Sequence, residues 1–96
     1  MTTYSLKIIT SRGKLFDGMV KSVIVPGYDA ELGVLAGHAQ MLVILKKGGI
    51  KVLTDSAEKY FAIDSGVLEV TPKHDVLILG DNVLETKTLA EAKAKG

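Results

Sequence analysis

The feature that most restricts the fold of this chain is a series of short apolar segments separated by turn-forming residues. Residues 4–8 alternate apolar and polar side chains, which is the two-residue period of a strand with one buried face. Similar segments follow at residues 22–25, 41–45, 50–53, 59–63, 67–71 and 76–79. This spacing predicts a mainly β fold, an antiparallel β-sandwich or flattened barrel of about eight to ten short strands.

Individual segments carry more specific predictions. Residues 41–45 are apolar throughout, and their β-branched members favour a strand buried on both faces over a buried helix segment. Asp17 and Gly18 are typical of a turn, residues 46–49 of a hairpin connection, and residues 76–79 of the last strand. The side chains expected in the core are Leu6, Ile8, Val23, Val25, Val43, Leu45, Val52, Val70 and Leu77.

The last residues of the chain differ in character from the rest. Residues 88–95 are rich in strong helix formers, and Thr88 with Glu91 three positions later fits a capping box. A helix this short is not stable alone in water, so we expect it either to pack on the sandwich through Leu89 and Ala92 or to fray. The sequence therefore predicts a β-sandwich domain at residues 4–84 and a C-terminal helical stub at residues 85–96.

The composition is typical of one globular domain. The 96 residues are 47% hydrophobic and 24% charged, which suits a single core. A net charge of +1 gives no general attraction to nucleic acid or to an anionic membrane. The sequence has no cysteine, no apolar run near the roughly 20 residues of a membrane helix, and no signal-peptide pattern. We therefore expect a cytosolic or matrix-like location.

The sequence lacks the patterns of common catalytic and metal sites. His38 and His74 are the only histidines, and they lack the close spacing with further ligands that a zinc site needs. No serine lies in a Gly-x-Ser-x-Gly elbow, so a hydrolase triad with His38 has no exposed nucleophile. No Gly-x-x-x-x-Gly-Lys-Ser/Thr loop is present to hold a nucleotide phosphate. We predict no catalysis, no metal and no cofactor.

The most distinctive local sequence lies at residues 26–41. Pro26 and Gly27 are a turn signal, and Gly27, Gly33 and Gly37 suit positions with positive φ or close backbone approach. The pattern predicts a strand, a shaped loop, a second short strand and another turn, rather than a flexible loop.

This stretch carries a resemblance to a known family. Residues 26–39 contain Pro-Gly, Glu-Leu-Gly-Val-Leu and Gly-His-Ala, which together resemble the hallmark of the epsilon subunit of F-type ATP synthases, called delta in mitochondria. Ala36 and Gln40 stand where that family has prolines. Residues 65–70 and 75–81 are similar to two further segments of the family, in the same order and spacing.

The resemblance implies a ten-stranded sandwich of two sheets and a place in a rotary motor. It implies a non-catalytic central-stalk subunit that couples the gamma subunit to the membrane c-ring of a proton-translocating enzyme during ATP synthesis. Such a subunit is peripheral on the cytoplasmic face of the bacterial membrane, or on the equivalent side of an organelle membrane, as part of the F1 sector. It touches the membrane only through the c-ring, binds no nucleic acid, and is not expected to form a homo-oligomer.

The resemblance also assigns roles to individual residues. Those implied to meet the gamma subunit are His38, Ser11 and Met41; those implied to meet the c-ring are Glu31 and Asp29; and those that shape the loop are Pro26, Gly27, Gly33 and Gly37. From the residues alone, His38 also fits a turn histidine bonded to nearby backbone, and Glu31 also fits a solvated carboxylate.

Two other functions stay open at the level of the sequence. A free-standing β-sandwich binding module would use the loop at residues 27–39 as its ligand rim, and an enzyme of unknown reaction is the more distant alternative. Most members of the resembled family continue into a two-helix C-terminal domain that inhibits ATP hydrolysis. Because the sequence given stops within the first of those helices, we expect coupling without helix-mediated inhibition.

Overall fold

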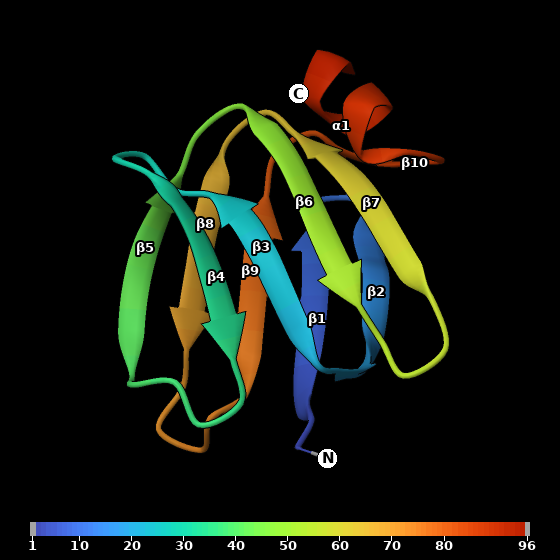
Figure 1. The fold of residues 1–96 in the computed structure, drawn as a ribbon. Coiled ribbons are helices and arrows are strands. Elements are labelled where there is room, and N and C mark those ends of the chain that lie inside the picture. Colours follow the sequence, from blue (N-terminus) through green and yellow to red (C-terminus); the bar gives the residue numbers. More distant parts are fainter. Residues whose placement is uncertain (1, 96) are drawn as a thin grey trace.

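Two five-stranded β-sheets pack face to face, and one short helix lies beside one end of the pair (Figure 1). The structure is a computed structural model that describes residues 2–95. The first sheet has the strand order β2-β1-β9-β8-β5, and the second has the order β10-β7-β6-β3-β4. The elements are β1 (Tyr4–Thr10), β2 (Gly13–Val20), β3 (Ser22–Pro26), β4 (Glu31–Leu35), β5 (Met41–Leu45), β6 (Gly48–Leu53), β7 (Glu58–Ile63), β8 (Gly66–Val70), β9 (Val76–Gly80), β10 (Val83–Thr86) and α1 (Leu89–Lys95). The predicted β-sandwich with a short C-terminal helix is confirmed.

Many connections carry the chain from one sheet to the other. The predicted hairpin at residues 46–49 is wrong, because β5 belongs to the first sheet and β6 to the second. At this crossing the backbone N–H of Lys46 donates to the carbonyl of Pro26 at 2.9 Å. β1 and β9 pair in parallel, whereas the other strand pairs, among them β1–β2, β5–β8 and β3–β4, are antiparallel. The crossing connections join the two sheets at both ends (Figure 1).

β2 is a single strand, so the turn predicted at Asp17 and Gly18 is wrong. Both residues pair with β1, where Asp17 lies opposite Lys7 and Gly18 opposite Leu6. Asp17 points to solvent, where its Oδ2 lies 2.8 Å from the Nζ of Lys14, and the hydrogen bond from that lysine lowers the pKa of the Asp17 carboxyl. This Asp-Gly pair continues a strand and does not form a turn, because both residues are paired with β1.

Residues 76–79 are not the last strand, because β10 follows and pairs with β7 at the edge of the second sheet. The turn between β9 and β10 is held by the N–H of Asp81, which donates to Ser65, and by the carbonyl of Asn82, which accepts from Asp64, each at 3.1 Å. Among the residues of β10, Val83 is the one that packs against the core. One inward side chain is too weak a pattern to mark a strand in the sequence.

The core lies between the two sheets and takes alternate residues from each strand. The buried side chains include Leu6, Ile8, Val23, Val25, Leu45, Val52 and Val70, as predicted. Val43 is half-buried against the core. Val76 and Ile78 of β9 face the core, so Leu77 between them lies on the outer face, where it is half-buried, and its predicted place in the core is wrong. A strand register that differs by one residue exchanges the two faces completely.

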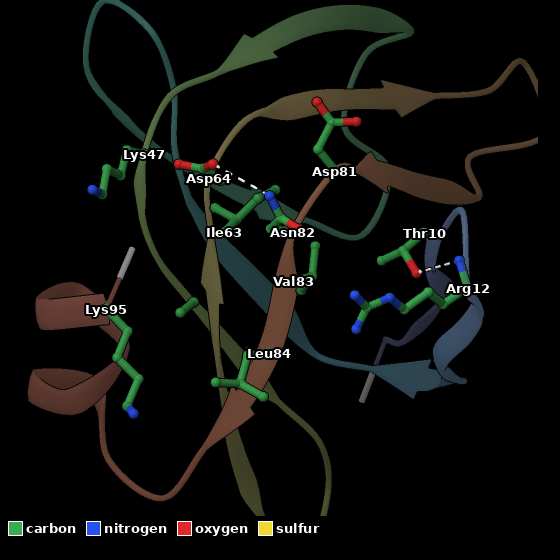
Figure 2. Close-up of a pocket in the computed structure, with 11 residues that line it drawn as sticks. Thr10, Arg12, Lys47, Ile63, Asp64, Asp81, Asn82, Val83, Leu84 and Lys95 are labelled. Atoms are coloured by element: carbon green, nitrogen blue, oxygen red, sulfur yellow. Dashed lines mark hydrogen bonds between the residues drawn. The ribbon is translucent and has the colours of Figure 1, made fainter.

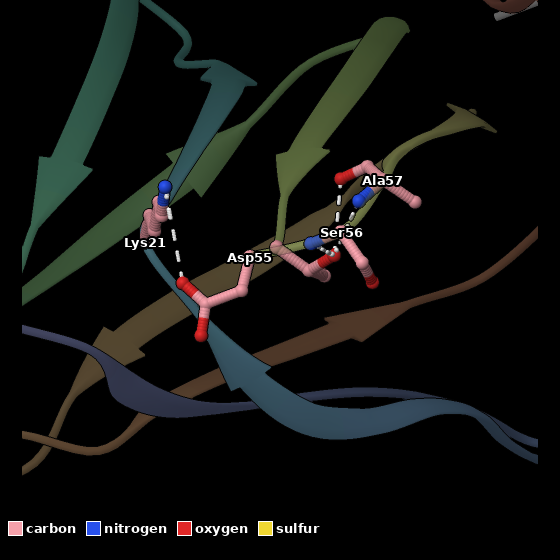
Figure 3. A network of polar contacts seen from close by, with 5 residues as sticks. Lys21, Asp55, Ser56 and Ala57 are labelled. Carbon is pink, nitrogen blue, oxygen red and sulfur yellow. Dashed lines mark hydrogen bonds and ion pairs between the residues drawn. The ribbon is translucent and has the colours of Figure 1, made fainter.

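The turn between β6 and β7 is tied to the start of β3 at the lower end of the view in Figure 1. Thr54 closes this turn, since its Oγ1 accepts from the N–H groups of Ser56 at 3.3 Å and Ala57 at 3.0 Å. Asp55 projects from the turn, and its Oδ1 lies 3.8 Å from the Nζ of Lys21 (Figure 3). Lys21 lies between β2 and β3, so this contact holds the β6–β7 turn to the connection between these two strands.

α1 packs on the outer face of the second sheet. Ala92 is fully buried there and lies over Gly49, where an added Cβ atom would be 3.3 Å from the Cβ of Ala92. The Oγ1 of Thr88 accepts from the N–H of Glu91 at 3.1 Å, and the Oε1 of Glu91 accepts from the N–H of Lys87 at 2.9 Å. The predicted helix, its N-terminal cap and its packing through Ala92 are confirmed.

Candidate docking surfaces

Glycines give the segment between β3 and β5 its shape, although not all in the expected way. A Cβ atom on Gly27 would lie 2.4 Å from the carbonyl oxygen of Ala30, so only glycine fits there. Gly37 has a φ angle of +77°, which glycine adopts without strain. Gly33 has neither property, since its φ is not positive and an added Cβ would lie 4.0 Å from the Cγ1 of Ile24. The expectation for Gly33 is wrong within this chain.

The predicted partner residues lie at opposite ends of the sandwich. Asp29 is exposed in the β3–β4 connection and Glu31 at the first position of β4, and Ser11 is exposed in the β1–β2 turn. Both connections lie at the upper end in Figure 1. His38 and Met41 belong to the β4–β5 connection and the start of β5, at the lower end. The structure therefore brings His38 and Met41 together and keeps Ser11 apart from them.

His38 is half-buried in a tight turn. Its backbone N–H donates to the carbonyl of Leu35 at 3.2 Å, and its ring Nδ1 lies 3.2 Å from the carbonyl oxygen of Ala39. Met41 follows, half-buried against the core at the start of β5. The side chain of His38 is thus oriented by local backbone contacts, as one of the two sequence-based interpretations expected.

The outer face of the first sheet exposes a row of apolar side chains. Leu42 is 68% exposed, Ile44 55% and Leu79 47%, so the predicted burial of residues 41–45 on both faces is wrong. Strand pairing sets Ile44 beside Val67, Val67 beside Leu79, and Leu79 beside Ile9 across four strands. We call this row, together with Leu42 and Leu77, the β5 face. The row Ile44–Val67–Leu79–Ile9 is contiguous, whereas Glu69 lies between Leu42 and Leu77 in the adjacent row. Contiguous exposed apolar surface is typical of interaction sites, so this face is a candidate for one.

An open groove of about 620 Å³ lies between the β3–β4 connection and β5. Tyr28 lines it and is 68% exposed, and its backbone N–H donates to the carbonyl of Ile44 at 2.8 Å. Asp29 and Glu31 line the same groove with exposed carboxylates. This acidic groove continues directly into the β5 face, because Ile44 and Leu42 belong to both.

A second hollow, of about 400 Å³, lies at the upper end between four connections and α1 (Figure 2). Its charged lining residues are the cations Arg12, Lys47 and Lys95 and the carboxylates Asp64 and Asp81. The carboxylates are engaged in the turns, since Asp64 accepts from the side-chain amide of Asn82 at 3.4 Å and Asp81 from the hydroxyl of Ser65 at 3.2 Å. The residues lining the hollow include no histidine.

Two properties hold for residues 2–95. No three His, Cys, Asp or Glu side chains among them lie close enough together to share a metal ion. No helix in this part of the chain is long and apolar enough to cross a membrane.

The fold and these surfaces define a class of protein: a small β-sandwich that presents an apolar face and an acidic groove for docking. The family model of the ATP synthase delta/epsilon chain β-sandwich domain matches residues 3–86. This chain belongs to that family.

Individual relatives agree with this assignment. The chain is 37% identical to the ATP synthase epsilon chain of Helicobacter acinonychis over 87 residues, which cover 91% of this chain and 70% of the relative. It is 35% identical to the ATP synthase epsilon chain of Psychrobacter cryohalolentis over 94 residues, covering 97% of this chain and 67% of the relative.

Solved structures share the fold. A chain in the cryo-EM structure of the Euglena gracilis mitochondrial ATP synthase matches with a TM-score of 0.82 and 20% identity, covering 88% of this chain and 54% of that one. A chain in the Tetrahymena thermophila mitochondrial ATP synthase central stalk and c-ring matches with a TM-score of 0.74 and 16% identity, covering 86% and 66%. This chain therefore spans about half of the first structural neighbour.

The β5 face is the candidate docking surface that sequence reasoning missed. Its signal was present, since residues 41–45 are apolar on both faces of the strand. A sequence pattern does not distinguish an apolar face covered by the same chain from one left for another chain.

Proposed function

We propose that this chain is a non-catalytic rotor subunit in the central stalk of a proton-translocating F-type ATP synthase. It couples the gamma subunit to the c-ring during ATP synthesis, and it is peripheral on the cytoplasmic or equivalent face of the membrane as part of the F1 sector. Membership in the delta/epsilon family supports this proposal. The single observation that carries it is the β5 face, an apolar surface of the first sheet that no other part of the described chain covers.

The gamma subunit docks on the β5 face. Ser11 and His38 lie at opposite ends of the first sheet, and a five-residue strand such as β5 spans about 16 Å. One partner that lies along the outer face of that sheet would reach both ends. Leu42 lies near His38 on this path and Ile44 leads toward Ser11, whereas the neighbouring Met41 begins β5 with its side chain packed against the core. Burial of the apolar row supplies most of the affinity, at about 25 cal/mol for each Å² removed from water.

The c-ring docks at the acidic groove. Asp29 and Glu31 offer carboxylates to cationic side chains of the ring's polar loops, and Tyr28 adds an exposed aromatic ring beside them. Charge-assisted hydrogen bonds fix the orientation of such a contact. Each exposed ion pair contributes only about 0–1 kcal/mol. The charges therefore guide docking, and the apolar side chains of the acidic groove supply most of the binding free energy.

In this proposal residues 4–84 form the docking domain and residues 85–96 form its C-terminal segment, in which Glu85 and Thr86 complete β10 and residues 89–95 form α1. The domain transmits torque mechanically, because a closely packed core deforms little under strain. A partner on the β5 face and a partner in the adjoining acidic groove both contact the same strand, β5. Rotation of the c-ring thus reaches the gamma subunit through a short, stiff path.

The experiment is binding to a purified gamma–c-ring subcomplex, followed by proton-driven ATP synthesis in reconstituted vesicles. We expect stoichiometric binding and a rise in synthesis over vesicles without the chain. The alternative function, a free-standing β-sandwich module that uses residues 27–39, predicts co-purification of an unrelated ligand and no binding to the subcomplex. Failure to bind the subcomplex would reject the rotor function.

A further inference from the structure

His74 has an unusual backbone conformation in the connection between β8 and β9. Its φ angle is +68°, and among residues 2–95 no other residue except glycine has a positive φ. The left-handed conformation is fixed locally, since the N–H of His74 donates to the carbonyl of Thr71 at 2.9 Å and the N–H of Thr71 donates to Asp75 at 2.8 Å. The hydroxyl of Thr71 also accepts from the N–H of Asp75 at 3.2 Å. The turn therefore holds the His74 side chain in a defined direction.

That direction leads to the other histidine of the chain. The ring Nδ1 of His74 lies 3.4 Å from the backbone carbonyl oxygen of His38, which is 36 residues away in sequence. A carbonyl oxygen only accepts, so this bond requires the His74 tautomer that carries its proton on Nδ1. The ring Nδ1 of His38 lies 3.2 Å from the carbonyl of Ala39 and requires the same tautomer.

The connection at residues 36–40 has few other restraints. Its other hydrogen bonds in the described part of the chain are local, from the N–H of His38 to Leu35 and from the His38 ring to Ala39. The bond from His74 is the one that ties this turn to a different pair of strands, β8 and β9. Removal of the His74 ring would therefore loosen the turn that presents His38 without disturbing the core.

We propose that His74 is a positioning residue for the gamma-docking surface, and this inference rests on the proposed function. His74 donates from Nδ1 to the His38 carbonyl and holds the 36–40 turn in its docking shape. With the proton on Nδ1 in the neutral form of each ring, Nε2 carries none, and the His38 ring then offers a hydrogen-bond acceptor. The partner group that meets the His38 ring is a hydrogen-bond donor, such as a hydroxyl, an amide or an ammonium group.

The first test uses the isolated chain and needs no partner. Long-range nitrogen–proton NMR of the two imidazoles, at a pH where both are neutral, should show the Nδ1–H tautomer for His74 and His38. Amide hydrogen exchange at His38 should accelerate about three- to tenfold in His74→Gly, which keeps the left-handed backbone and removes the donor. In His74→Asn it should stay within about twofold of the parent, because the Asn amide nitrogen occupies the place of Nδ1. An Nε2–H tautomer at His74, or unchanged exchange in His74→Gly, overturns the inference.

The second test measures affinity for the gamma subunit. His74→Gly should bind about three- to tenfold more weakly than the parent, and His74→Asn should restore parental affinity. Equal affinity of His74→Gly and the parent overturns the positioning role even if the turn has loosened. His38→Ala separates the docking role of His38 from the positioning role of His74. Parental binding by that variant rejects His38 as a docking residue, whatever the tautomer of His74. A thermal unfolding midpoint within about 2 °C of the parent shows that each variant is folded.

Discussion

The hydroxyl of Tyr4 donates a hydrogen bond to the backbone carbonyl of Val34 at 2.6 Å, and the two residues belong to different sheets. Tyr4 opens β1 in the first sheet and is 5% exposed, whereas Val34 lies in β4 at the edge of the second sheet. Burial raises the pKa of the Tyr4 hydroxyl far above its ordinary value. The neutral phenol therefore fastens β4, the strand that leads into the His38 turn, to the body of the sandwich.

Tyr4→Phe should lower the free energy of unfolding at pH 7 by about 1 kcal/mol, because the Val34 carbonyl loses its donor. The parent should also lose stability in alkali. The folded pKa of Tyr4 exceeds the unfolded value of about 10, so the folded chain binds the proton more tightly. This contribution is complete below about pH 10 and is lost as the pH rises further.

Urea unfolding at pH 7 and at several values from 9 to 11 measures both effects. The phenylalanine variant should show a shallower alkaline decline than the parent. Tyr28→Phe, at a ring that is 68% exposed, is the control for removing one tyrosine. Parallel alkaline curves for the parent and Tyr4→Phe would contradict the role of the buried phenol.

Two neighbouring residues in β9 test which face of the strand is buried. Ile78 is fully buried and Leu77 half-buried on the opposite face. Ile78→Ala should cost about 2–5 kcal/mol, because it leaves a cavity in the core. Leu77→Ala should cost about 1 kcal/mol, since only part of its surface is removed from water. Equal shifts of the urea midpoint for the two variants would show that the register is wrong.

Gly49 lies where α1 packs on the second sheet, and its lack of a side chain leaves room for the helix. A Cβ atom there would lie 3.1 Å from the Cγ and 3.3 Å from the backbone nitrogen of Lys93. Gly49→Val should push the helix off the sheet, so the amide of Ala92 should exchange at least about tenfold faster. Gly33→Val is the matched control, because an added Cβ at that strand position makes only an ordinary contact, 4.0 Å from the Cγ1 of Ile24. Unchanged protection of α1 in Gly49→Val would show that the helix does not need this glycine.

The sequence predicted the architecture well and single connections poorly, for a physical reason. Alternation of apolar and polar residues marks a strand and its buried face, which is why Leu6, Ile8 and Val23 are placed correctly. The alternation does not indicate which strands pair with each other in a sheet. Asp17–Gly18 and residues 46–49 have turn chemistry, yet their outcome depends on pairing with distant strands. Such long-range choices leave little trace in a local pattern.

The features of the candidate site also fall into local ones, which the sequence predicts, and long-range ones, which it does not. Gly27 and Gly37 were predictable, because their requirement for glycine is local. The contact between His74 and His38 was not, because it joins two connections 36 residues apart. The β5 face was visible as apolar sequence, but its exposure depends on what covers β5 in the folded chain.

Ile44→Lys tests the β5 face most directly. Ile44 is 55% exposed on an edge strand, where lysine is well tolerated, so the variant should unfold at the parental temperature within about 2 °C. Docking would bury the new ammonium group among apolar side chains, so affinity for the gamma subunit should fall at least about tenfold. Leu84→Lys is the matched control, because Leu84 is 54% exposed on β10, an edge strand of the second sheet. It should bind like the parent in the same titration. Equal losses in both variants would point to a general charge effect, and no loss in Ile44→Lys would exclude the β5 face as the gamma-docking surface.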